Sequence, residues 1–136
     1  MNIRDLMTSD VQTVSPGDTV QQAAGFMLSA DTGSIPVCDG EKVIGMITDR
    51  DIALRGIAAG KGPDCRVREL MSDNVIFARD TDDARTVATQ MSDAQVRRLP
   101  VLDADEKLVG MISLGDLSRE AEQSVASEAL EGVSAK

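Results

Sequence analysis

The sequence predicts an α/β (α+β) fold that consists of two β-α-β-β-α repeats packed with pseudo-two-fold symmetry. Three observations support this prediction. The chain is internally repeated, both copies show strand-like and helix-like hydrophobic patterns in the same order, and its 136 residues are typical of one domain rather than two. Because a unit of about 60 residues buries too little surface to be robust alone, we expect the copies to pack sheet against sheet.

The internal repeat is visible when the sequence is compared with itself. A shift of 64 residues places Arg4-Asp5-Leu6-Met7 on Arg68-Glu69-Leu70-Met71. One extra residue in the second copy then changes the shift to 65, which places Gly45-Met46-Ile47-Thr48 on Gly110-Met111-Ile112-Ser113. Apart from Met1, every methionine belongs to a matched pair. Agreement of this extent along the chain indicates a duplication.

In the first copy, a short β-prone run at 11–14 ends at the turn Ser15-Pro16-Gly17-Asp18 and is followed by a helix. Residues at helical spacing predict one buried face on this helix, namely Val20, Ala23, Ala24, Met27 and Leu28. Thr19, with Gln22 three residues later, resembles a capping box at the helix start. The second copy repeats the apolar stripe over residues 84–91.

Two strands and a second helix complete each copy. Residues 35–38 and 42–48 are apolar strand candidates, and Asp39-Gly40 between them is a strong signal for a tight hairpin. A second helix is predicted to begin at Asp49 and, in the second copy, at Leu114. Both copies therefore show the same order of elements.

The composition of the chain divides it into four parts. We expect a first repeat at residues 1–60, a linker rich in Gly and Pro at 61–67, a second repeat at 68–122, and an acidic, frayed C-terminal tail at 123–136.

The residue types that are absent exclude several classes of function. The chain has no His, Trp or Tyr and only two Cys, so it can form neither a Ser-His or Cys-His catalytic pair nor a usual zinc site. We therefore predict no metal, no catalytic residue and no enzyme activity, and we expect Cys38 and Cys65 to be reduced thiols. The net charge of −9 and the lack of stacking aromatics argue against nucleic-acid binding.

No apolar run approaches the roughly 20 residues of a membrane span, and the N-terminus lacks the apolar stretch of a signal peptide. We expect a cytoplasmic protein that does not act at a membrane.

The most informative motif lies where the last strand of each copy leads into a helix. It reads Thr48-Asp49-Arg50-Asp51 in the first copy and Ser113-Leu114-Gly115-Asp116 in the second. A hydroxyl followed three residues later by a carboxylate can cap a helix, which is a purely structural role. The same geometry can bind phosphate at the helix N-terminus, with the carboxylate beside it accepting hydrogen bonds from ribose hydroxyls. The recurrence of the motif after a Gly-containing strand favours the second interpretation.

The doubled order of a Leu-Met segment, a Pro-Val strand and a Gly-x-x-Thr/Ser-x-x-Asp junction resembles a tandem pair of cystathionine-β-synthase (CBS) domains, also called a Bateman module, from about Arg4 to Arg119. The resemblance implies clefts between the repeats that bind an adenosine ligand such as AMP, ADP, ATP or S-adenosylmethionine, with no cofactor required. It implies that the aspartate of each junction holds the ribose, that the hydroxyl holds phosphate, and that the strand around each proline lines the base pocket.

The ligand-binding residues that we predict, from this resemblance and from local charge, are Thr13, Val14, Ser34, Ile35, Pro36, Thr48, Arg50 and Asp51 in the first copy, and Phe77, Ala78, Arg97, Arg98, Leu99, Pro100, Ser113 and Asp116 in the second.

The arginines in this set allow two interpretations. An acidic protein that binds phosphate must concentrate positive charge locally, and arginine suits bidentate phosphate contacts. Alternatively, these arginines form ion pairs with neighbours such as Asp49, which would contribute little energy. Both interpretations stay open for Arg50 and Arg98, and ion pairing is favoured for Arg97.

We therefore expect a stand-alone regulatory module, without an attached enzyme domain, that senses an adenosine ligand and signals by a change in shape or in affinity for a regulated protein. The family resemblance implies a homodimer formed through the helices. The alternative is a ligand-free scaffold or stress-response interaction protein with vestigial clefts.

Overall fold

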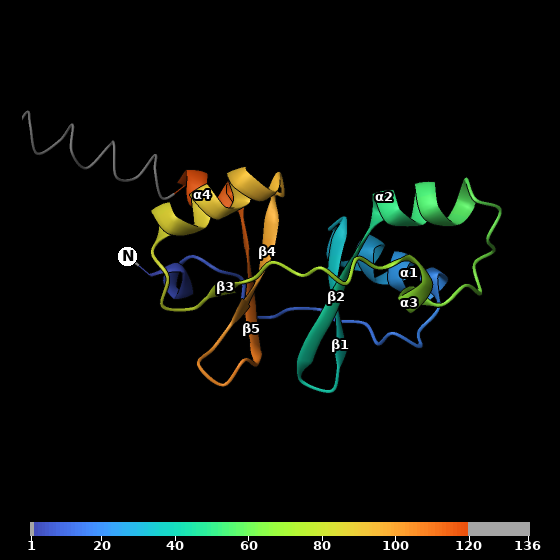
Figure 1. Cartoon of the computed structure of the whole chain (residues 1–136), viewed down its shortest axis with the longest axis horizontal. Coiled ribbons are helices and arrows are strands. Elements are labelled where there is room, and N and C mark those ends of the chain that lie inside the picture. Colours follow the sequence, from blue (N-terminus) through green and yellow to red (C-terminus); the bar gives the residue numbers. More distant parts are fainter. Residues whose placement is uncertain (1, 120–136) are drawn as a thin grey trace, which may run out of the picture. The chain divides into compact units, whose positions relative to one another are not determined.

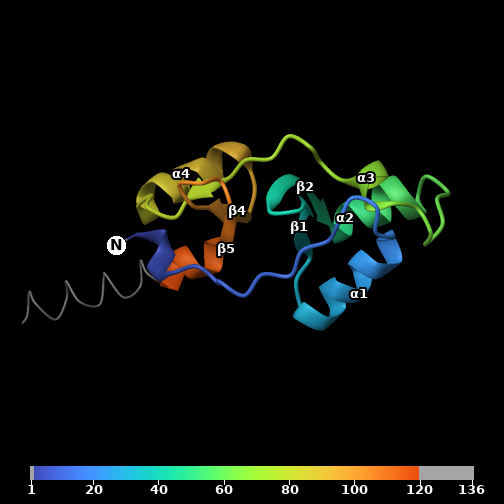
Figure 2. The same cartoon turned by 90° about the horizontal axis from the view of Figure 1, so that it is seen from below.

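The computed structural model describes residues 2–119, which form two compact units. Unit 1 contains residues 2–9, 77–103 and 109–119, and unit 2 contains residues 10–76 and 104–108. Figures 1 and 2 show the helices and strands of both units in two views. In the described part of the chain, no helix has the length and apolar character that crossing a membrane requires.

Unit 2 is built on a two-stranded antiparallel sheet of β1 (Ser34–Asp39) and β2 (Lys42–Thr48). The hairpin between the strands turns at Gly40, whose positive φ of 65° suits a residue without a side chain. The helices of this unit are α1 (Val20–Ala30), α2 (Asp49–Asp51), the π-helix η2 (Ile52–Ile57), which continues from α2, and α3 (Val67–Leu70). The strand predicted at 11–14 is reduced to one parallel bridge between Val14 and Val37.

Helix α1 confirms the predicted capping box, since Thr19 and Gln22 exchange hydrogen bonds at its N-terminus. Its buried face is narrower than the sequence predicts. Val20, Ala23 and Met27 are buried, whereas Ala24 is exposed and Leu28 is 84% exposed. The prediction that Ala24 and Leu28 are buried is therefore wrong, because only the stripe of Val20, Ala23 and Met27 packs into the core of this unit.

Unit 1 contains a three-stranded sheet in the order β3 (Ala78–Arg79), β4 (Arg98–Leu102) and β5 (Leu108–Ser113). Helix α4 (Ala84–Ala94) buries Val87 and Met91, and β5 leads directly into a helix that the structure describes at 114–119. The short helix η1 (Ile3–Asp5) also belongs to this unit and places Ile3 in its core. The predicted element order is thus present in both copies, with a first strand that is very short in the second copy and only a bridge in the first.

The compact units do not coincide with the two sequence copies, because each copy gives its leading segment to the other unit. Thr8 exchanges two backbone hydrogen bonds with Met111 on β5, with N···O distances of 2.9 and 2.8 Å. Ser72 makes the equivalent pair with Met46 on β2, with both distances 2.9 Å. This exchange explains why the Leu-Met segment and the Gly-Met strand are duplicated together.

Candidate functional site

In unit 2, the candidate site is the junction between β2 and α2. The Thr48 hydroxyl oxygen accepts a hydrogen bond from the Asp51 backbone N–H at 3.1 Å, and the Asp51 carboxylate accepts one from the Thr48 backbone N–H at 3.0 Å. The two residues therefore form a reciprocal capping box. This arrangement fixes the Asp51 carboxylate beside the first turn of the helix, where backbone N–H groups and the helix dipole favour an anion.

The other predicted residues of unit 2 lie on or next to the two strands that end at this junction. Ser34 lies opposite Thr48 in the antiparallel pair of β1 and β2. The Val14 backbone N–H donates to the Pro36 carbonyl oxygen at 3.1 Å, which attaches the 13–14 segment to the same strand. Thr13 and Arg50 are exposed, and Ser34, Thr48 and Asp51 are half-buried. Val14, Ile35 and Pro36 are buried, so their side chains support the fold of this region from within.

In unit 1, the junction between β5 and the following helix has the same design. The Ser113 hydroxyl oxygen accepts a hydrogen bond from the Asp116 backbone N–H at 3.2 Å, and the Asp116 carboxylate accepts one from the Ser113 backbone N–H at 3.0 Å. The Leu114 backbone N–H donates to the Arg97 carbonyl oxygen at 2.9 Å, which places Arg97 beside the junction. The structure therefore forms the predicted hydroxyl–carboxylate pair twice.

The remaining predicted residues of unit 1 lie on or next to β3 and β4. Ala78 on β3 pairs in parallel with Val101 on β4, the equivalent of the bridge in unit 2. Ala78, Leu99 and Pro100 are buried, whereas Phe77, Arg97 and Arg98 are exposed. Burial places the side chains of the first three residues in or beside the core of the unit.

The three predicted arginines are exposed, and within residues 2–119 none of them forms an ion pair. The Asp49 carboxylate accepts a hydrogen bond from the backbone N–H of Arg50, at 2.8 Å, and not from its guanidinium group. This geometry leaves the guanidinium groups of Arg50, Arg97 and Arg98 accessible to an anion.

The main difference between the two junctions is an ion pair that sequence reasoning missed. Arg119 contacts the Asp116 carboxylate through Nη2, whereas no cation of the described residues pairs with Asp51. The signal was present, because an arginine three residues after an aspartate on a helix can reach it. The Asp116 carboxylate therefore has a second partner that the Asp51 carboxylate lacks.

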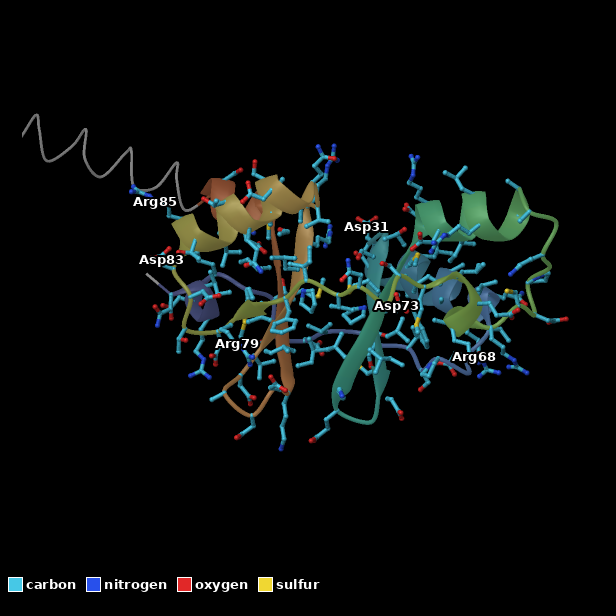
Figure 3. The ribbon with its side chains drawn as sticks, viewed as in Figure 1. Asp31, Arg68, Asp73, Arg79, Asp83 and Arg85 are labelled. Atoms are coloured by element: carbon cyan, nitrogen blue, oxygen red, sulfur yellow. The ribbon has the colours of Figure 1, made fainter. Side chains whose placement is uncertain are left out.

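Phe77 also has neighbours that the sequence did not indicate. The Arg79 guanidinium lies 5.1 Å from the centroid of the Phe77 ring, which is a cation–π distance, and Gln90 Nε2 donates to the Phe77 carbonyl oxygen at 2.8 Å. Arg79 is labelled on β3 in Figure 3. The conformation of the segment before α4 is thus held by two long polar side chains.

Neither cysteine has the features of a reactive thiol. Both are free thiols, and burial raises the pKa of Cys38. Desolvation, followed by a hydrogen bond to Glu69, raises the pKa of Cys65. Among the described residues, no three His, Cys, Asp or Glu side chains are grouped so that they could hold a metal ion.

The fold and the doubled junction define a class of protein: a tandem-repeat module with two similar candidate ligand sites. Residues 3–56 and 67–122 each match the family model of the CBS domain. The chain belongs to the CBS domain family and carries a tandem pair of these domains.

Similar proteins are known in sequence and in structure. The chain is 40% identical over 117 residues to the CBS domain-containing protein YhcV of Bacillus subtilis. This match covers 86% of this chain and 83% of YhcV. The CBS domain pair of protein MJ0100 in complex with 5′-methylthioadenosine and S-adenosyl-L-methionine has a TM-score of 0.82 and 26% identity, covering 91% of this chain and 98% of that one. CBSX2 in complex with AMP has a TM-score of 0.77 and 27% identity, covering 90% and 96%.

Some relatives bear the name of an enzyme, such as homoserine O-acetyltransferase and inosine-5′-monophosphate dehydrogenase. They are much larger proteins, of which the matched region covers 24% or less. The similarity is thus to an accessory CBS region in these enzymes.

Proposed function

We propose that this protein is a regulatory CBS-pair module that binds an adenosine ligand at its strand-to-helix junctions and signals by a change in conformation or in partner affinity. The observation that carries the proposal is the doubled capping box, with Asp51 and Asp116 held beside a helix N-terminus.

The chemistry of the junction suits a nucleotide. A helix N-terminus attracts phosphate through its backbone N–H groups and its dipole. Each carboxylate oxygen can accept more than one hydrogen bond, so an aspartate that caps the helix can also accept from ribose hydroxyls. In a chain with a net charge of −9, the exposed Arg50, Arg97 and Arg98, which form no ion pair within residues 2–119, supply the local positive charge that a phosphate needs.

The similar structures support the same class of ligand. One holds 5′-methylthioadenosine and S-adenosyl-L-methionine, and another holds AMP. Adenosine is the part that these ligands share, so we infer that the adenosine moiety is the common element of recognition here as well.

The helices of unit 2 suggest how the module would associate. Leu28 and Ile57 are exposed apolar side chains on α1 and η2. Exposed apolar surface of this kind favours association with another protein surface. We propose that it forms the interface of a homodimer, which is the commonest symmetric oligomer.

A thermal-shift panel with AMP, ADP, ATP and S-adenosylmethionine tests the ligand, because a molecule that binds only the folded state raises the unfolding temperature. Guanosine monophosphate and ribose 5-phosphate serve as controls for base and phosphate. We expect at least one adenosine compound, and neither control, to stabilise the protein. If none of the adenosine compounds does so, the module is the ligand-free scaffold described above.

A further inference from the structure

We propose that Arg119 makes the two junctions unequal: it occupies the carboxylate of Asp116, so that the Asp51 junction is the stronger adenosine site. This inference rests on the proposed function. In this role, Arg119 lowers the affinity of the unit 1 junction for the adenosine ligand.

The contacts of the two aspartates carry the inference. The side chain of Asp116 is only 10% exposed, and its two oxygens have different partners, the Ser113 backbone N–H and Arg119. Asp51 has the matching partner, the Thr48 backbone N–H, but within residues 2–119 its carboxylate has no cation. A ribose that approached Asp116 would have to share or displace the guanidinium group, whereas a ribose at Asp51 would not.

The two copies differ in sequence at the position of Arg119. The shift of 65 residues that aligns Thr48 with Ser113 places Leu54 at the position of Arg119. Leucine cannot form an ion pair, and Leu54 is an exposed side chain. The two copies have therefore diverged at a position that faces the carboxylate in one of them.

The size of the effect follows from the exposure of Arg119, whose side chain is 69% exposed. Ion pairs of exposed side chains are weak because water and salt screen them. We expect the pair to lower the affinity of the unit 1 junction about three- to tenfold, and we expect added salt to reduce the difference.

Calorimetry measures the AMP affinity of each junction separately, in a variant in which the aspartate of the other junction is replaced. In an Asp51→Ala background, which leaves the unit 1 junction as the site, we expect Arg119→Leu to strengthen AMP binding about three- to tenfold. In an Asp116→Ala background, we expect the reciprocal change, Leu54→Arg, to weaken binding by a similar factor.

Two control variants test whether the effect is specific. Arg119→Lys keeps the positive charge and should strengthen binding less than Arg119→Leu does. Arg85→Leu removes another exposed arginine of unit 1, on α4 (labelled in Figure 3), and should leave AMP affinity unchanged. Circular dichroism of each variant checks that the fold is retained.

The outcomes separate this inference from the proposed function. If the wild type binds AMP but Arg119→Leu leaves the unit 1 affinity unchanged or lowers it, the inference is wrong and the proposed function stands. A loss of affinity for AMP, but not for adenosine, would show that Arg119 holds the phosphate instead. If the wild type binds none of the four adenosine compounds, both proposals fail.

Discussion

Gly110 on β5 lies directly against the backbone of Thr8, so that a β-carbon at position 110 would be 2.8 Å from the Thr8 carbonyl oxygen. The same oxygen accepts a hydrogen bond from the Met111 backbone N–H at 2.8 Å. Gly45 has the equivalent relationship with Ser72, where the distance from a β-carbon to the carbonyl oxygen would also be 2.8 Å. Both glycines are needed because a leading segment lies against each strand.

We expect Gly110→Ala to destabilise the protein. The Thr8 oxygen could move away from the new β-carbon only by weakening its hydrogen bond with the Met111 backbone N–H. Overpacking of this kind costs about 1–3 kcal/mol, which urea unfolding would measure. Gly25→Ala is the matched control, since a β-carbon at this helical position would meet nothing within 4 Å apart from its chain neighbours and the backbone of its own helix. It should stabilise the protein by roughly 0.5–1 kcal/mol. A Gly110→Ala protein that unfolds at the urea concentration of the wild type would contradict the close approach.

We expect Ile3→Ala to destabilise unit 1 by about 2–4 kcal/mol, because Ile3 is fully buried in its core and a cavity would remain. Arg4 adds an ion pair to Asp80 at 2.6 Å, which attaches the same segment. Ile76→Ala, at a partly exposed side chain outside both core clusters, should cost much less. Hydrogen exchange would locate the effect: faster exchange is expected for amides of β5, which pairs with the segment. Equal losses for the two variants would show that the N-terminal segment is not part of the core.

In an Asp116→Ala background, which leaves the unit 2 junction as the site, we expect Asp51→Ala to weaken AMP binding about tenfold or more, since hydrogen bonds to a charged acceptor contribute roughly 1.5–3 kcal/mol each and 1.4 kcal/mol is one decade of affinity. The 2′-deoxy form of AMP should bind the Asp116→Ala protein weakly and should bind the double variant about as well as AMP does. If Asp51 only caps the helix, Asp51→Ala should lower the free energy of unfolding by roughly 0.5–2 kcal/mol and leave the affinity for AMP unchanged. Calorimetry with both ligands distinguishes the two roles.

We expect Leu28→Glu to convert a dimer into a monomer, because it would bury a charge in the proposed interface. Light scattering at micromolar concentration would follow the mass, which is 14.4 kDa for one chain. Thr89→Glu, on an exposed position of α4, controls for the added charge alone. A wild-type mass of one chain would refute the homodimer.

The stability of α4 should depend on pH through its N-cap, Asp83. The hydrogen bond from the Thr86 backbone N–H lowers the pKa of Asp83 below its ordinary value of 3.8. Because the pKa is lowered in the folded state, the carboxylate stabilises the fold above pH 3.8 and loses this contribution as the pH falls through the folded-state pKa. The difference in unfolding temperature between wild type and Asp83→Ala should therefore be largest near neutral pH and shrink in acid. The difference between Asp83→Asn and Asp83→Ala should persist in acid, since asparagine caps without titrating.

The sequence by itself determined the local structure of this protein. The capping boxes at Thr19 and Thr48 and the hairpin at Gly40 were predicted correctly, because their hydrogen bonds join residues only a few positions apart. The duplication then predicted that both junctions would form the same hydroxyl–carboxylate pair, which they do.

Only the tertiary structure decided which surfaces those local elements meet. Hydrophobic spacing does not reveal that Leu28 is exposed, nor that the segment carrying Thr8 pairs with Met111 of the other copy. These contacts are set by the packing of segments distant in sequence, and such packing leaves no periodic signal in the chain.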